Sequence, residues 1–261
     1  MPEANTNPEL IQAIQNNKEQ DVLKFIQKKS VEPGEAALKA IELGSLNVLK
    51  SIVANYSAAN SATTPLNLSD PQNTYLIAAC TAGNVEIITY LVKEAGVNPN
   101  TNQYGYSPVS AAANASRKDI ITLLENLGAN LRENEHNTLY LLAKNDNLPM
   151  MKYLVEELKF DLHADEEIAL RTASKNGHHE IVAYLVDNGA DLSNIGSVAL
   201  SLAVTNNHFD MAAKYVEAGV DWSFLEEEKD SLKQIADAIK NEESEYAQNL
   251  ITHLVMHQLD S

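Results

Sequence analysis

The stretch that decides the fold runs from Thr74 to Leu91, TYLIAACTAGNVEIITYL, because nearly the same pattern returns from Ile168 to Leu185 as IALRTASKNGHHEIVAYL. Small residues, one glycine and paired apolar residues occupy the same places in both copies, and the two glycines are Gly83 and Gly177. A pattern that returns along a chain is typical of solenoid architectures, in which each unit packs only on its neighbours.

The glycine position recurs along the chain, with serine, aspartate or asparagine in three of its occurrences. Its residues are Gly44, Gly83, Ser116, Asp146, Gly177 and Asn207, separated by 39, 33, 30, 31 and 30 residues. Glycine, asparagine and aspartate tolerate the left-handed backbone conformation that ends a helix. We therefore predict that a short first helix ends at each of these positions.

A second helix is predicted after each glycine position. In the copy at 74–91, the acidic Glu86 is followed by apolar Ile87, Ile88 and Leu91. An acidic residue in the first turn offsets the helix dipole, and the apolar spacing places one helix face against a core. Each unit is thus expected to be a pair of antiparallel helices, and the chain to be all-α.

These repeats resemble the ankyrin family. The fullest match is Asn102 to Asn130, NQYGYSPVSAAANASRKDIITLLENLGAN, which is similar to the family pattern of a polar tip residue, Gly, a Thr-Pro-Leu-His-like helix start, Ala-Ala, an apolar second helix and Gly-Ala-Asp. Gly177 to Asp191, GHHEIVAYLVDNGAD, is nearly as close. The resemblance implies an ankyrin-repeat solenoid of about six to eight helix-turn-helix units. It also implies protein binding rather than catalysis.

We expect a single ankyrin-repeat domain over residues 1–261. Its parts are a divergent capping unit at 1–34, a repeat at 35–56, an insertion at 57–73, core repeats at 74–222 and capping helices at 223–261. Terminal units of a solenoid present one face to water, which accounts for their divergence. The insertion is longer than an ordinary connection, so we interpret it as an ordered or semi-ordered loop rather than a linker between independent domains.

One departure from the family concerns the histidine near the start of the first helix. Ile77, Ser110, Tyr140, Arg171 and Ser201 stand in its place. The hydrogen bonds that usually tie neighbouring loops are therefore expected to be weaker, or to be replaced by others.

The charge and the cysteine content exclude several classes of function. The chain has 19 Lys and Arg against 36 Asp and Glu, a formal net charge of −17. Such a charge repels phosphate backbones and anionic membranes. The single cysteine, Cys80, fits a reducing compartment, and no apolar run has the length of a signal peptide or membrane span. We expect a cytoplasmic monomer that neither binds nucleic acid nor inserts into membranes.

Candidates for catalysis or metal binding are few. His253 and His257 have the i, i+4 spacing of a metal pair, but the glutamate of the corresponding motif is absent, so we interpret them as a solvated helix face. His178 and His179 follow a glycine position, where the family has loop residues. Cys80 takes a small-residue position, where it would pack between helices. We predict no catalytic residue, no metal site and no cofactor.

The resemblance also assigns a binding surface. Ankyrin proteins usually meet partners with their loop tips and the inward face of the first helices, where the two residues before each glycine position point. The predicted partner-binding residues are Tyr104, Tyr106, Tyr140, Lys144, Asn145, Arg171, Lys175, Asn176, Thr205 and Asn206. Because Lys144, Arg171 and Lys175 are cations in an acidic chain, the expected partner is an acidic or phosphorylated segment of a protein. The alternative is that the lysines only solubilise the inner face.

The leading interpretation is a non-catalytic module that acts as an adaptor or an inhibitor. The glutamate-rich stretch from Glu226 and the tail Leu250 to Ser261 resemble export signals of bacterial type IV effectors, which would place the protein in a host cytoplasm. Two alternatives stay open. One is an enzyme or enzyme accessory with active residues in the divergent termini or the 57–73 insertion. The other is a scaffold that self-associates through residues 250–259.

Overall fold

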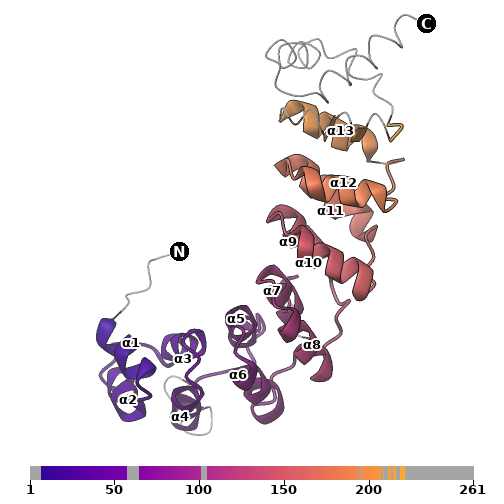
Figure 1. The fold of residues 1–261 in the computed structure, drawn as a ribbon. Coiled ribbons are helices and arrows are strands. Elements are labelled where there is room, and N and C mark those ends of the chain that lie inside the picture. Colours follow the sequence, from indigo (N-terminus) through magenta and orange to yellow (C-terminus); the bar gives the residue numbers. More distant parts are fainter. Residues whose placement is uncertain are drawn as a thin grey trace, which may run out of the picture. The chain divides into compact units, whose positions relative to one another are not determined.

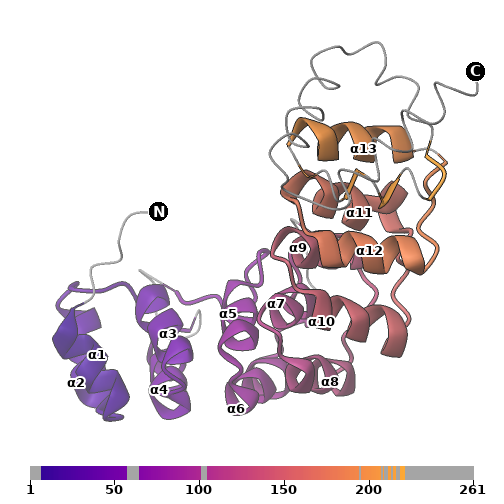
Figure 2. The same cartoon turned by 45° about the horizontal axis from the view of Figure 1, so that its top comes forward.

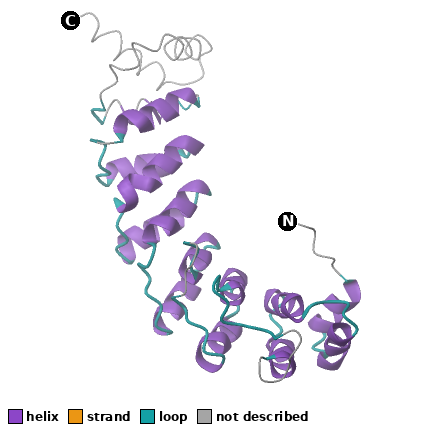
Figure 3. Cartoon of the chain, turned by 180° about the vertical axis from the view of Figure 1, so that it is seen from behind, coloured by secondary structure: helices purple, strands orange, loops and turns teal. Residues whose placement is uncertain are grey.

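A computed structural model of the chain describes residues 7–57, 65–100, 105–193, 195–206, 208, 211–212, 214–215 and 218–220. The chain divides into two compact units, Met1–Asn134 and Glu135–Ser261. Within the described ranges, all regular secondary structure elements are helices (Figure 3), which confirms the prediction of an all-α fold.

Helix pairs make up the described part of the N-terminal unit (Figure 1). First helices pack on one another in sequence, α1 on α3, α3 on α5 and α5 on α7. Helix α6 continues into a π-helical turn, η1 (Tyr90–Glu94). The pairs are α1 (Pro8–Gln15) with α2 (Glu19–Gln27), α3 (Pro33–Glu42) with α4 (Leu46–Tyr56), α5 (Thr74–Ala82) with α6 (Val85–Thr89), and α7 (Pro108–Asn114) with α8 (Lys118–Asn126).

The C-terminal unit repeats this arrangement (Figure 2). Helix α11 (Ala164–Asn176) lies between α9 (Glu135–Lys144) and α13 (Gly196–Thr205), so three first helices form one layer. The second helices are α10 (Leu148–Lys152), which continues as the π-helical turn η2 (Tyr153–Glu157), and α12 (His179–Asp187). The single-domain organisation over 1–261 stays a prediction.

The turns between the paired helices adopt the backbone conformation expected from the sequence. Gly44, Gly83, Ser116, Asp146 and Gly177 have φ of 72°, 78°, 57°, 55° and 76°, all left-handed. The residue after this turn then donates its backbone N–H to the carbonyl five positions earlier, which is an alanine at four of the turns, as from His178 to Ala173 at 3.0 Å, and Leu142 at the turn of Asp146. This bond satisfies a carbonyl left open at the helix end. The predicted frame is confirmed at these five positions, and Asn207 lies outside the described residues.

Apolar residues of the second helices and small residues of the first helices form the core. Ile181 and Val182 of α12 are fully buried, as is Ala173 of α11. Cys80 is also fully buried, and burial raises the pKa of its thiol. A buried, protonated thiol is a poor nucleophile, which agrees with the predicted packing role.

The described part of the insertion packs on the N-terminal unit. Leu66 and Leu68 are buried, and the Leu66 backbone N–H donates to the Tyr56 carbonyl at 2.6 Å. At its end, Asp70 Oδ1 accepts from the Thr74 backbone N–H at 2.8 Å. A carboxylate in this place satisfies an open donor of the first turn of α5.

Candidate functional site

A hollow in the C-terminal unit brings together half of the predicted partner-binding residues. It has a volume of about 500 Å³, and its walls come from α9, α11 and α13. We call it the basic groove, and it is lined by Tyr140, Lys144, Ile168, Arg171, Thr172, Lys175, Asn176 and Leu202.

Helical spacing explains why these residues share one surface. Residues three or four apart lie on the same helix face. Tyr140 and Lys144 are four apart on α9, and Arg171 and Lys175 are four apart on α11. Since α9 packs on α11, the two faces meet along their length.

Among the described residues, three cations and no carboxylate line the basic groove. Lys144 and Lys175 are exposed, and Lys144 Nζ lies 5.9 Å from the centre of the Tyr140 ring. Arg171 is held more firmly, because its Nη2 donates to the Asp165 carbonyl at 3.0 Å and lies 4.0 Å from the Asp165 carboxylate. The groove is therefore electropositive within a chain of net charge −17.

The other predicted residues do not join this groove. Asn145 and Asn206 are exposed but absent from its lining, and Asn206 Nδ2 donates back to the Leu202 carbonyl at 2.7 Å. Tyr106 belongs to the N-terminal unit, where burial raises its pKa. Tyr104 and the side chain of Thr205 lie outside the described residues. Conversely, no pattern in the sequence indicated the apolar lining residues Ile168 and Leu202.

Side-chain hydrogen bonds join successive units at the ends of their first helices. They come from the residue directly after the left-handed turn, which reaches a carbonyl near the end of the previous first helix. Such bonds satisfy carbonyls that have no partner within their own helix. The bonds are Ser45 Oγ to the Ile14 carbonyl at 3.0 Å, Asn84 Nδ2 to Ile41 at 2.5 Å, Arg117 Nη2 to Ala82 at 3.2 Å, and His178 Nε2 to Lys144 at 3.1 Å. His178 thus has a structural role.

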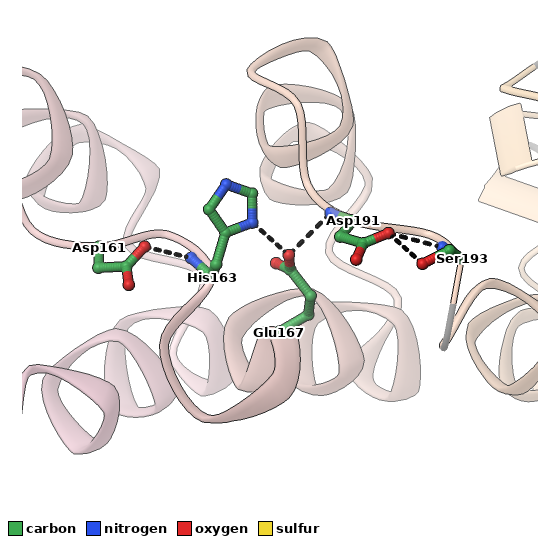
Figure 4. Close-up of polar contacts among 5 residues, drawn as sticks. All are labelled: Asp161, His163, Glu167, Asp191 and Ser193. Atoms are coloured by element: carbon green, nitrogen blue, oxygen red, sulfur yellow. Dashed lines mark hydrogen bonds and ion pairs between the residues drawn. The ribbon is translucent and has the colours of Figure 1, made fainter.

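A second network joins the two loops on either side of α11 and α12 (Figure 4). Glu167 lies at its centre, with a side chain only 5% exposed. Its Oε1 accepts from the Asp191 backbone N–H at 2.7 Å and lies 2.5 Å from His163 Nδ1. Asp161 Oδ1 accepts from the His163 backbone N–H at 3.0 Å, and Asp191 Oδ1 accepts from Ser193 N–H and O–H. We call these five residues the Glu167 network.

The backbone beside this network is strained. Asp165, Glu166 and Glu167 have φ of 50°, 51° and 61°, in the left-handed region that residues other than glycine rarely enter. Each such residue costs on the order of 1–3 kcal/mol, so neighbouring contacts must hold the turn in place. The bonds of Glu167 and the bond from Arg171 to the Asp165 carbonyl do so, and the latter links this turn to the basic groove.

The Glu167 network makes stability depend on pH. The hydrogen bond to Glu167 raises the pKa of His163, so the folded state holds this proton more tightly than the unfolded chain. The stability that His163 contributes is therefore complete below its unfolded pKa and is lost as pH rises through its folded pKa. We expect His163→Gln to reduce the loss of stability between about pH 6 and pH 8, as measured by urea unfolding.

His208 provides a control of opposite sign. Burial and the charges of His179 and His178 lower its pKa, so its contribution is lost as pH falls. His208→Gln should therefore reduce the loss of stability on the acid side. If both variants change the pH profile in the same direction, the assignment to His163 is wrong.

Along the described chain, no three His, Cys, Asp or Glu side chains gather in a way that could hold a metal ion. None of the helices within the described ranges combines the length and apolarity needed to cross a bilayer. His253, His257, the acidic stretch from Glu226 and the tail at 250–261 lie outside those ranges.

Comparison with known proteins gives the same family along most of the chain. Residues 10–103, 39–135, 110–196 and 139–223 match the family described as ankyrin repeats (3 copies). The putative ankyrin repeat protein L675 of Acanthamoeba polyphaga mimivirus is 27% identical over 151 residues, which are 57% of this chain and 30% of that protein. Alpha-latrocrustotoxin-Lt1a of Latrodectus tredecimguttatus is 28% identical over 119 residues, which are 43% of this chain and 8% of the toxin.

The chain therefore covers less than a third of the length of either relative. The family match extends over the paired helices, the left-handed turns and the layer of first helices that carries the basic groove. The chain belongs to the ankyrin-repeat family, and its repeats form a protein–protein interaction module.

Proposed function

We propose that the C-terminal unit binds an acidic or phosphorylated segment of a partner protein in the basic groove. The observation that supports this most strongly is charge segregation. Lys144, Arg171 and Lys175 line one hollow, and no carboxylate belongs to the part of its lining that the structure describes, although the chain has 36 acidic residues against 19 basic ones. Complementary charge steers a partner to a surface and selects it over neutral competitors.

The three cations suit different parts of an anionic ligand. Arg171 is fixed by its bond to the Asp165 carbonyl, so it can present its remaining donors with little loss of entropy. Lys144 and Lys175 are exposed, and their flexible side chains can move their charges toward a carboxylate or phosphate. Tyr140 adds amphipathic contact area beside Lys144. The volume of about 500 Å³ falls within the usual range for ligand pockets.

Binding of this kind makes the protein an adaptor, or an inhibitor that covers its target. Neither role needs a catalytic residue. Delivery by a bacterium into a host cell stays a prediction, because the tail on which it rests lies outside the described residues. The cytoplasmic location and the monomeric state stay predictions for the full chain as well.

The partner class can be tested with peptides matched at one position. Peptides carrying phosphoserine, glutamate or serine in an otherwise identical sequence would be titrated against the full chain. We expect phosphoserine and glutamate peptides to bind at least about tenfold more tightly than serine peptides, since charge-assisted hydrogen bonds are worth roughly 1.5–3 kcal/mol. Their affinity should fall as salt is raised. Equal affinity for all three peptides would contradict the proposal.

A further inference from the structure

A separate cavity lies beside the Glu167 network in the C-terminal unit. It has a volume of about 270 Å³ and is lined by His163, Glu166, Glu167, Asp191 and Ile195. None of these residues lines the basic groove. We call it the acidic cavity, because its lining holds three carboxylates.

One oxygen of Glu167 has no partner among the described residues. Oε1 accepts from Asp191 N–H and contacts His163 Nδ1, whereas Oε2 is buried without a hydrogen bond. Leaving a buried acceptor without a donor costs roughly 1–3 kcal/mol, more when it is charged. The side chain is 5% exposed and belongs to a residue that lines the cavity, so this buried acceptor lies beside the space that a ligand donor would enter.

The surroundings of this oxygen select for positive charge. Glu166 and Asp191 are exposed carboxylates on the same wall, and Asp161 lies close by, bonded to the His163 backbone N–H. His163 is the one titratable base in the lining. A positively charged ligand that donates a hydrogen bond to Glu167 Oε2 would satisfy this acceptor and would also complement the charge of the surrounding carboxylates.

The residues that line the cavity distinguish between cations. Within the described chain, no three acidic or histidine side chains converge closely enough to hold one metal ion. A planar guanidinium can instead spread its five donors over separated acceptors. Its weakly hydrated faces also tolerate an apolar neighbour, and Ile195 provides a buried apolar wall. An ammonium group is compact and strongly hydrated, so it fits this lining less well.

We propose that the acidic cavity binds the guanidinium group of an arginine side chain from a partner protein. Glu167 Oε2 accepts one N–H of the guanidinium, while Glu166 and Asp191 carry the complementary charge. This site does not depend on the function proposed for the basic groove. Arg171 bonds to the carbonyl of Asp165, next to Glu166, so the two sites occupy neighbouring parts of one unit.

N-acetylarginine amide is a direct probe of this cavity. Titrated into the full chain, it should shift the backbone amide signal of Asp191 in nuclear magnetic resonance spectra, because that N–H donates to Glu167. N-acetylcitrulline amide has nearly the same shape without the charge, so it should cause no shift. We expect N-acetyllysine amide and calcium to bind at least about fivefold more weakly than the arginine probe.

Two variants locate the site. Glu166→Gln leaves the hydrogen bonds of the Glu167 network in place and should weaken arginine binding about threefold to tenfold. Glu167→Gln should abolish binding, and its amide spectrum shows whether the turn still folds. Lys144→Gln with Lys175→Gln removes two groove cations without adding carboxylates and should leave arginine binding nearly unchanged, which separates this site from the basic groove.

Three results would overturn the proposal. The first is no shift of the Asp191 amide with the arginine probe. The second is an equal response to citrulline, lysine or calcium. The third is unchanged affinity in Glu166→Gln. Because Glu166→Gln and the citrulline control need no change to Glu167, the test holds even where Glu167→Gln does not fold.

Discussion

Replacing Lys144 and Lys175 together with glutamate is expected to weaken binding of an acidic or phosphorylated segment at least about 100-fold, with helical content unchanged. The double change turns a groove lined by three cations into one lined by a single cation and two anions. Both lysine side chains are exposed, so the core keeps its packing. The measurements are titration of a phosphoserine or glutamate peptide and circular dichroism of the full chain.

A charge-matched control separates the groove from the general field of the protein. Lys28 and Lys93 are exposed and lie in the N-terminal unit. Lys28→Glu with Lys93→Glu makes the same change in net charge and should alter affinity less than about threefold, because neither lysine lines the basic groove and salt screens exposed charges that make no direct contact with the ligand. Equal weakening by both double variants would show that net charge, and not the basic groove, governs binding.

The largest expected effect on stability is in the core of the α11–α12 pair. Val182 is fully buried on α12, and Val182→Ala should lower the free energy of unfolding by about 2 kcal/mol. The free energy of unfolding falls for two reasons, because two buried carbon atoms are removed and because a cavity is left in their place. It would be measured by urea unfolding of the full chain, followed by circular dichroism.

The same substitution at an exposed position is the matched control. Val198 of α13 is 51% exposed, so Val198→Ala removes the same atoms without opening a cavity. We expect a change within about 0.5 kcal/mol, since alanine also favours helix. If both variants lose a similar free energy of unfolding, then the burial of Val182 does not stabilise the unit.

Destabilising the α11–α12 helix pair should also disturb the basic groove. In a solenoid each unit is held mainly by its neighbours. Helix α11 carries Arg171 and Lys175 and packs on α12, so Val182→Ala should loosen the groove at urea concentrations where the intact chain still binds. The Val198→Ala variant should keep its affinity under those conditions.

The sequence by itself determined the repeat frame, the all-α fold and the places where first helices end. These features depend on residues within one unit, such as glycine at a left-handed turn and apolar pairs one helical turn apart. Tertiary structure decided the rest. The bonds from Arg171 to the Asp165 carbonyl and from the Asp191 N–H to Glu167 Oε1 depend on three consecutive left-handed residues that no local pattern indicates.

The same holds for contacts between units. Asn84 reaches the Ile41 carbonyl across 43 positions of sequence, and His178 reaches Lys144 across 34. The sequence shows which polar residues follow the left-handed turns, but not which carbonyls their side chains reach. Only the packed helices decide which of them lies within hydrogen-bonding distance, because that distance depends on how neighbouring units stack and which rotamers the stack allows.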